Sequence, residues 1–364
     1  MRARKALPGW VDYGLIPLLN VTCAFLVSGL VVLAIGADPL EAVQILVWGA
    51  FGFGEGIGFT LFYATNFIFT GLAVAIAFHG GLFNIGAEGQ AALGGLGATL
   101  VCLALDRLVP WWVTLPFAAL AAGLFGAGWA AIPAWLQAKR GSHIVITTIM
   151  FNFLAAALMG YLLVDVLVAP GSMQPETRTF AAGGRLPPLR ELFPDIGLGQ
   201  APVNVAFLLA LVALVAIWVL VWRTRLGYEI RVFGANPVAA SYAGISATKI
   251  TMIAMMLSGA LAGLMSLNEI MGYQQRLLLD FTAGAGFVGI AVALMGRAHP
   301  VGIFLAAVLF GALYQGGAEL AFEIPEISRD MIVVIQGLVI LFAGALENLF
   351  RPALVRLFVR RGGI

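Results

Sequence analysis

Residues 205–222 read VAFLLALVALVAIWVLVW, an apolar run without a single charged residue. A transmembrane helix requires about 20 predominantly apolar residues, and several other runs approach this length. Hydrophobic residues make up 61% of the 364 residues and charged residues 10%, whereas soluble domains contain about 45–50% and about 25%. A membrane β-barrel would instead show segments of about 10 residues with alternating polarity. The sequence therefore predicts an all-α polytopic membrane protein.

Breaks between the apolar runs predict ten transmembrane spans in a single transmembrane domain, residues 1–364. The eighth span is the shortest, and residues 39–54 are predicted to form an additional helix on the outer surface. The ten spans are residues 13–36, 60–79, 87–105, 111–137, 143–168, 201–222, 248–271, 284–296, 300–320 and 330–350.

The lysine and arginine residues orient these spans, because cytoplasmic loops are enriched in both. With both termini in the cytoplasm, 14 of the 20 basic residues fall on the inner side. This orientation places residues 169–200 outside and residues 223–249 inside. The inner basic residues are Arg2, Arg4, Lys5, Lys139, Arg140, Arg223, Arg225, Arg231, Lys249, Arg297, Arg351, Arg356, Arg360 and Arg361. The net charge of +2, without a basic patch interleaved with aromatics, gives no indication of nucleic-acid binding.

The inner segment 223–249 contains a local helix signal. Asn236 is a favoured N-cap residue and Pro237 is tolerated in the first helical turn. We therefore predict a short helix from Pro237 to about Tyr242, ended by Gly244. Such a helix is either a docking device for a cytoplasmic partner or an ordinary surface helix, and the local pattern does not choose between them.

Two longer motifs resemble one family of transporters. GYEIRVFGANPVAASYAGIS (residues 227–246) resembles the coupling loop of ABC importer permeases for sugars, nucleosides and branched-chain amino acids. GLFNIGAEGQAALGG (residues 81–95) resembles the signature of the nucleoside branch, and GSHIVITTIMFNF (141–153) and PGSMQPETRTF (170–180) also fit it. The resemblance covers nearly the whole chain.

The resemblance implies a bacterial plasma (inner) membrane permease with two related halves, spans two to five and seven to ten, that carries nucleosides or related N-ribosides. Its implied partners are an ABC ATPase, a second homologous permease in a heterodimer and an external substrate-binding lipoprotein, besides membrane lipid. ATP and magnesium would be bound by the ATPase and no cofactor by this chain. The implied ATPase contacts are Arg231, Gly234, Asn236, Pro237, Ala240, Ala243 and Gly244.

The positions of the lysines are consistent with ATP being bound by a separate polypeptide. The chain contains only Lys5, Lys139 and Lys249, and none stands in a G-x-x-x-x-G-K-[ST] phosphate-binding loop. If transport is driven by ATP, force must enter through a cytoplasmic surface. Small residues such as Ala239, Ala240 and Ala243 would allow the predicted inner helix to seat closely against a partner.

Polar residues inside the apolar runs are candidates for the substrate pathway, because hydrocarbon does not solvate them. Asn84, Glu88 and Gln90 mark a predicted break between spans two and three, with Glu88 in the first turn of span three. The break either packs tightly or lines the pathway, since irregular backbone at membrane depth requires protein or water around it.

Two further asparagines, Asn66 and Asn152, lie in the middle of spans. Each either forms an interhelical hydrogen bond or lines the pathway. Asn268 and Glu269 lie near the outer end of span seven, where Glu269 is predicted to reach interfacial water.

Three other functions compete with nucleoside import. The same machinery would carry ribose, another simple sugar or branched-chain amino acids. An ion-coupled secondary transporter would carry charged relay residues deep in its spans, and here mid-span acids are scarce. A membrane enzyme would show a nucleophile–base pair or a metal cluster, and no such pattern is visible. The chain is therefore predicted to be a transport subunit and not an enzyme.

Overall fold

The computed structural model describes residues 8, 11–327, 329–342 and 354–355, and within them every regular element is helical. Two isolated antiparallel bridges, Glu176–Leu278 and Pro188–Asn204, are the only extended pairings described. The main helices are α1 (Ile16–Ile35), α2 (Pro39–Phe51), α3 (Gly54–His79), α4 (Ala87–Leu105), α5 (Trp111–Arg140), α6 (Ile144–Tyr161), α7 (Leu189–Leu192), α8 (Val205–Arg223), α9 (Arg225–Ala235), α10 (Pro237–Tyr242), α11 (Ala247–Ser266), α12 (Ala285–Met295), α13 (Pro300–Glu323) and α14 (Arg329–Ile340).

Short helices of other types extend or connect these elements. Two π-helices, η2 (Leu162–Val166) and η5 (Leu267–Gln274), continue α6 and α11, and a third, η1 (Val11–Leu15), precedes α1. Two 3-10 turns, η3 (Ala182–Gly184) and η4 (Pro194–Ile196), lie between η2 and α8.

The all-helical membrane fold predicted from the sequence is confirmed. Eight helices of the described chain are long and apolar enough to span a membrane, and two shorter apolar helices are α2 and α12. Each of the ten predicted spans corresponds to a helix, the eighth to the 11-residue α12. The tenth is described only as far as Leu341 and Phe342. Its remainder, 343–350, and the terminal basic residues lie outside the described residues: Arg2, Arg4, Lys5, Arg351, Arg356, Arg360 and Arg361.

The chain forms two compact units, although the sequence predicts one domain. Unit 1 comprises Met1–Phe53 and Ala312–Ile364, and unit 2 comprises Gly54–Gly311. In unit 1, Val32 of α1, Ala42 of α2 and Leu320 of α13 share a small core with Ile332 and Ile335 of α14. Unit 2 carries the motifs and polar residues singled out above, so the site is described within it.

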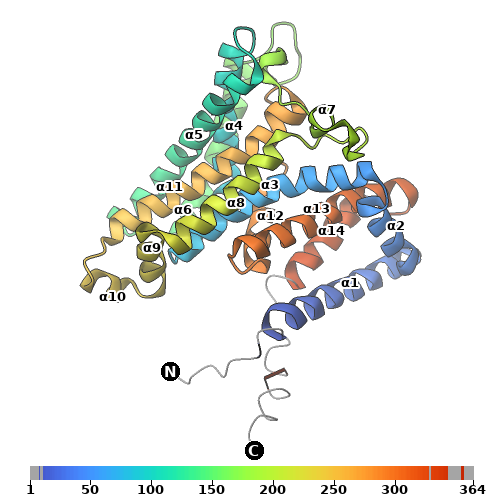
Figure 1. Ribbon diagram of the computed structural model, residues 1–364, viewed down its shortest axis with the longest axis horizontal. Coiled ribbons are helices and arrows are strands. Elements are labelled where there is room, and N and C mark those ends of the chain that lie inside the picture. The colour runs from blue at the N-terminus through green and yellow to red at the C-terminus, as the bar shows by residue number, and fades with distance from the viewer. Residues whose placement is uncertain (1–7, 9–10, 328, 343–353, 356–364) are drawn as a thin grey trace, which may run out of the picture. The chain divides into compact units, whose positions relative to one another are not determined.

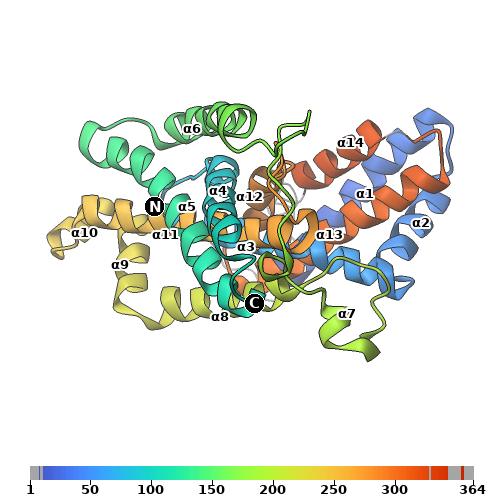
Figure 2. The ribbon, with the colours of Figure 1, turned by 90° about the horizontal axis from the view of Figure 1, so that it is seen from above.

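Helix α3 is the central element of unit 2. In its most apolar stretch, 83% of the residues are buried, and it packs against α8, α11 and α12 (Figure 2). Small residues bring neighbouring helices together. A Cβ atom at Gly126 of α5 would overlap the carbonyl oxygen of Gly259 of α11, and one at Gly94 of α4 would overlap Gly263. Glycine allows such close approach of membrane helices.

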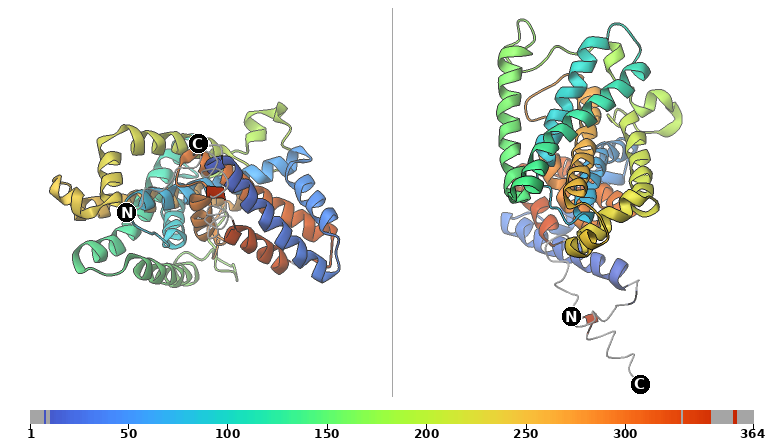
Figure 3. Two further views of the ribbon diagram at one scale, coloured as in Figure 1. Left: turned by 90° about the horizontal axis from the view of Figure 1, so that it is seen from below. Right: turned by 90° about the vertical axis from the view of Figure 1, so that its left-hand side faces the viewer.

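The segments predicted to lie outside and inside are at opposite ends of α8. Asn204 caps the start of this helix by accepting a hydrogen bond from the Ala206 amide at 2.9 Å, and Thr224 follows its last residue. Nineteen helical residues rise about 28 Å, close to the thickness of the hydrocarbon core. Figures 1 and 3 show the 169–200 segment with α7 at one end of the unit and α9–α10 at the other.

Cysteines at the most exposed positions of these segments will test the topology. Met173 is fully exposed and Tyr242 is 90% exposed. In a background without Cys23 and Cys102, we expect Met173→Cys to react with an impermeant thiol reagent from outside and Tyr242→Cys only from the cytoplasmic side. Labelling of both cysteines from the same side would contradict the ten-span orientation.

Candidate functional site

The predicted break between spans two and three is present. Helix α3 ends at His79 and α4 begins at Ala87, and the residues between them, 80–86, are called the break segment below. Gly81 turns the chain with φ +69°, and a Cβ atom there would press on the backbone of Gly234. Glu88 lies in the first turn of α4, as the sequence predicted.

Hydrogen bonds between the side chains of Asn84 and Gln90 join the break segment to the first turn of α4. The Asn84 amide donates to Gln90 Oε1 and to Ser258 Oγ, each at 2.8 Å, and Asn84 Oδ1 accepts from Gln90 Nε2 and the Gly86 amide. The Ser258 hydroxyl in turn donates to the carbonyl of Ala73 at 2.5 Å. Asn84 and Ser258 are fully buried and Gln90 is 1% exposed. These side chains therefore tie the break to α3 and α11.

The Glu88 carboxylate caps a different helix. It accepts hydrogen bonds from the Thr282 hydroxyl at 2.5 Å, the Gly284 amide at 2.9 Å and the Gly286 amide at 2.7 Å. Gly284 and Gly286 form the N-terminus of α12, where free amides and the helix dipole favour a negative charge. Glu88 therefore couples the first turn of α4 to the start of α12.

Asn152 of α6 supports the same turn from the other side. Its Oδ1 accepts from the Gly89 amide at 3.0 Å and its Nδ2 donates to the Ile85 carbonyl at 2.9 Å. Glu88 and Asn152 are half-buried, and both line a cavity of about 70 Å³ bounded by residues 278–282. Among the described residues, no group of three or more His, Cys, Asp or Glu side chains is placed to hold a metal ion.

Asn66 belongs to a second buried network. Its Nδ2 donates to Glu269 Oε1 at 2.6 Å, and its Oδ1 accepts from Asn268 at 2.8 Å. Asn268 also donates to the Phe62 carbonyl and accepts from Asn204 at 2.9 Å. The prediction that Glu269 reaches interfacial water is wrong, because its side chain is 8% exposed and faces α3. Residues Leu267–Met271 of η5 are all buried, so this segment is covered on every side and Asn268 and Glu269 both lie inside the unit.

The inner segment has the predicted helix. Asn236 caps α10 by accepting from the amides of Val238 and Ala239 at 3.1 and 3.0 Å, Pro237 is its first residue, and Gly244 follows with φ +78°. Residues 238–239 and 241–244 are exposed. The helix therefore offers an outward surface on which Val238 is 65% and Tyr242 is 90% exposed.

Three of the residues predicted to contact the ATPase are partly or fully buried. Ala240 is fully buried and packs with Ile230, Phe233 and Ile250, so its side chain holds α10 onto α9 and α11. Its contact with the ATPase stays a prediction. Gly234 of α9 packs directly on the carbonyl of His79. Arg231 is half-buried, and its Nε has no hydrogen-bond partner among the described residues.

Comparison with known proteins identifies the architecture. Residues 56–344 match the family described as branched-chain amino acid transport system, permease component. The chain belongs to this family. It is a multi-pass plasma-membrane permease of the ABC importer class, which confirms the predicted family and localisation. No solved structure matches the chain.

Relatives cover almost the whole chain. A glucose ABC transporter permease protein of Haloferax volcanii is 38% identical over 366 residues, covering 99% of this chain and 94% of that protein. A guanosine ABC transporter permease protein of Bacillus subtilis is 33% identical over 332 residues, covering 91% and 93%. A nucleoside ABC transporter permease protein of Lactococcus lactis is 31% identical over 332 residues, covering 90% of each. In each organism a second permease protein also matches, at 26–31% identity over 69–74% of this chain.

The permease also has an ion pair that the sequence analysis did not find. Arg178 donates to both oxygens of Asp106, at 2.6 and 3.0 Å, and the Ala181 amide donates to the same carboxylate at 2.7 Å. Asp106 directly follows α4 and is 3% exposed. Burial alone would raise the pKa of Asp106, but these hydrogen bonds and the charge of Arg178 hold it below its ordinary value. The pair fastens the 169–200 segment to the end of α4.

Because of this ion pair, the stability of the folded permease should fall at acid pH. Because the folded pKa of Asp106 is lowered, its contribution is fully present above the ordinary value of about 3.9 and is lost as the pH falls through the folded pKa. We expect Asp106→Asn to lower the thermal transition in detergent at pH 7. The difference from wild type should shrink as the pH falls below about 4. A difference that stays constant over this range would contradict the assignment.

Proposed function

We propose that this permease forms the translocation pathway for nucleosides or related N-ribosides in an ATP-driven importer. The observation that carries the proposal is the pair of relatives that are named as guanosine and nucleoside permeases and are aligned over 91% and 90% of this chain. The residues 81–95 that suggested the nucleoside branch form most of the break segment and the first half of α4, where Asn84 and Gln90 are buried and hydrogen-bonded to each other.

Within that pathway, Glu88 and Asn152 are the proposed lining residues. Both are half-buried and border a common cavity. Asn84, Gln90 and Asn66 are 0–4% exposed and bind other protein groups, so in this conformation their proposed part is to hold the pathway-forming helices in place. Irregular backbone at membrane depth is tolerated where it is buried in protein or lines a cavity, and Gly80, Leu82, Asn84 and Gly86 of the break segment are buried.

The proposed assembly contains an ATPase that binds ATP and magnesium, a second permease and an external substrate-binding lipoprotein. A heterodimer is supported by the second, more weakly matching permease in each of the three organisms above. The outward surface of α10, formed by residues 238–239 and 241–244, is the proposed ATPase contact. A movement of α10 would reach the break segment through Gly234 of α9, whose backbone lies against Gly80 and Gly81.

Substitutions on α10 will test the coupling surface. Val238→Asp combined with Tyr242→Ala removes the two large exposed apolar side chains of this helix without touching the buried Ala240. Aromatic anchors in interfaces commonly contribute about 2 kcal/mol or more, so ATPase co-purification should fall at least about tenfold. Tyr161→Ala, at a 59% exposed position at the end of α6 that leads to the 169–200 segment, is the matched control and should leave ATPase recovery unchanged. Equal recovery for the double variant and the control would exclude α10 as the contact.

A glucose permease is the relative with 38% identity, so a simple sugar is the second candidate substrate. Uptake of radiolabelled guanosine and glucose by cells expressing the full transporter separates the two. We expect ATP-dependent guanosine uptake that excess adenosine inhibits and excess glucose does not. Uptake of glucose without uptake of guanosine would replace the nucleoside proposal with the sugar one.

A further inference from the structure

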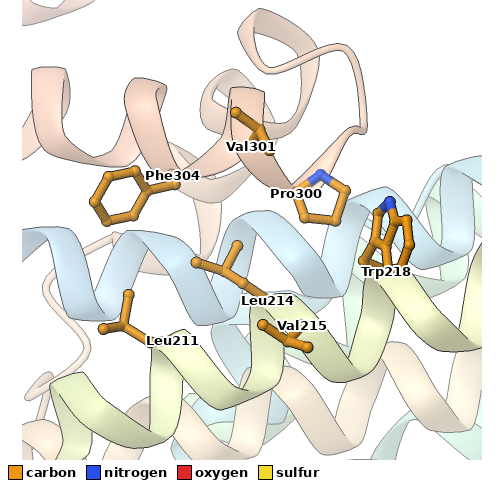
Figure 4. Close-up of a pocket in the computed structure, with 7 residues that line it drawn as sticks. All are labelled: Leu211, Leu214, Val215, Trp218, Pro300, Val301 and Phe304. Carbon is orange, nitrogen blue, oxygen red and sulfur yellow. The ribbon is translucent and has the colours of Figure 1, made fainter.

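Unit 2 has an apolar groove between α8 and the first turns of α13, with a volume of about 410 Å³. Figure 4 shows Leu211, Val215 and Trp218 of α8 on one side and Val301 and Phe304 of α13 on the other. Val215 is 63% and Val301 is 62% exposed. Apart from the indole N–H, the side chains that line the groove have no hydrogen-bonding group, so their chemistry suits a hydrocarbon chain.

The positively charged side chain of Arg223 lies at the end of this groove that Trp218 forms. The Arg223 guanidinium carbon lies 5.1 Å from the ring centroid of Trp218. Arg223 is exposed and pairs with no carboxylate among the described residues, whereas the neighbouring Arg225 is paired with Glu229 at 3.0 Å. A planar guanidinium binds phosphate oxygens well, and tryptophan is enriched where membrane meets water. The groove thus combines an apolar slot with a phosphate-binding end.

The predicted orientation places this end in the cytoplasmic leaflet, next to the inner segment. That leaflet carries the anionic lipids to which arginine and lysine near the surface are attracted. We propose that the α8–α13 groove binds an acyl chain of an anionic phospholipid and that Arg223 binds its phosphate. From Leu211 to Trp218, α8 rises about 10 Å, so the groove accommodates the part of the chain nearest the headgroup.

Two other occupants of the groove would give different experimental results. A neutral phospholipid would fill the slot without requiring Arg223. A helix from a second copy of the permease would fill it with side chains and exclude lipid. Charge complementarity favours the anionic lipid, because the exposed cation is held against the groove by its contact with Trp218.

Native mass spectrometry of the full-length permease in detergent will test the proposal. Phosphatidylglycerol and phosphatidylcholine with identical acyl chains are added at equal concentration, and the bound fraction of each is measured. We expect wild type to retain phosphatidylglycerol about fivefold better, as one basic residue near an anionic surface implies. Arg223→Gln should remove this preference, Arg223→Lys should keep most of it, and Val215→Trp should lower the binding of both lipids.

Arg140 provides a matched control. Its guanidinium carbon also lies over a tryptophan, 5.7 Å from the ring of Trp135, but neither residue lines the α8–α13 groove. Arg140→Gln should therefore leave the lipid preference intact. Equal binding of the two lipids by wild type, or an equal effect of Arg140→Gln and Arg223→Gln, would overturn the proposal.

A cross-linking experiment separates lipid from protein as the occupant. In a background without Cys23 and Cys102, a Val301→Cys permease should remain uncross-linked to a second permease in native membranes. A disulfide-linked dimer would overturn the lipid proposal and assign the groove to a protein interface. The thermal transition of each variant is measured alongside, and Val301→Trp replaces Val215→Trp if the latter lowers it.

Discussion

Gly126→Val is expected to prevent the permease from folding, whereas Gly128→Val on the same helix is expected to be tolerated. A Cβ atom at Gly126 would overlap the carbonyl oxygen of Gly259, and one at Gly259 would overlap that of Gly126. The two backbones are therefore in mutual contact, and neither yields as a flexible side chain would. At Gly128, no atom lies within 4 Å of an added Cβ.

The expected effect is large because α5 and α11 would have to separate along their whole contact. Overpacking of a core ordinarily costs about 1–3 kcal/mol and occasionally more, and here α4 would also be displaced through the contact between Gly94 and Gly263. The measurement is the yield of monodisperse protein in size-exclusion chromatography, with the thermal transition of whatever is recovered. Similar yields for the two valine variants would contradict the prediction, because they would mean that α5 and α11 accommodate the larger side chain at residue 126 with little loss of stability.

Features that depend on neighbouring residues were predictable from the sequence. The break between α3 and α4, the position of Glu88 in the first turn of α4 and the Asn236 cap of α10 all follow from local patterns of glycine, asparagine and proline. The helical membrane fold followed from the apolar runs. These features need no knowledge of how the helices pack.

Features that depend on packing were not predictable. Asn66 and Glu269 are 203 residues apart and Asp106 and Arg178 are 72 apart, so no local pattern pairs them. Asn268 and Glu269 are adjacent, and on a regular α-helix adjacent residues do not share a face. Both are nevertheless buried, because Leu267–Met271 of η5 are all buried and the segment is covered on every side. The burial of Ala240 was not predictable for a related reason, because a six-residue helix of small residues gives no clear sign of which side is buried.

Glu88→Gln is expected to reduce transport by at least about tenfold while the permease still inserts and still binds its ATPase. The carboxylate accepts three hydrogen bonds, two of them from the amides that begin α12. A glutamine keeps one oxygen acceptor, and its NH₂ group would face donors that it is unable to bind. Each hydrogen bond to an ionised group contributes about 1.5–3 kcal/mol, and about 1.4 kcal/mol corresponds to a tenfold change. Loss of one such bond therefore accounts for the expected effect if the contact between α4 and α12 is needed for transport.

The control is the same change at Glu41, which is exposed in the first turn of α2. Glu41→Gln removes one negative charge from a helix N-terminus without a described contact to another helix, and uptake should stay near the wild-type rate. Thr282→Val removes only the hydroxyl donor to Glu88 and leaves both backbone donors, so its effect should be intermediate. Uptake is measured at matched surface expression, with ATPase co-purification as the second readout. Wild-type uptake by Glu88→Gln would mean that the α4–α12 contact serves packing alone, because the ATPase surface on α10 is unchanged in this variant.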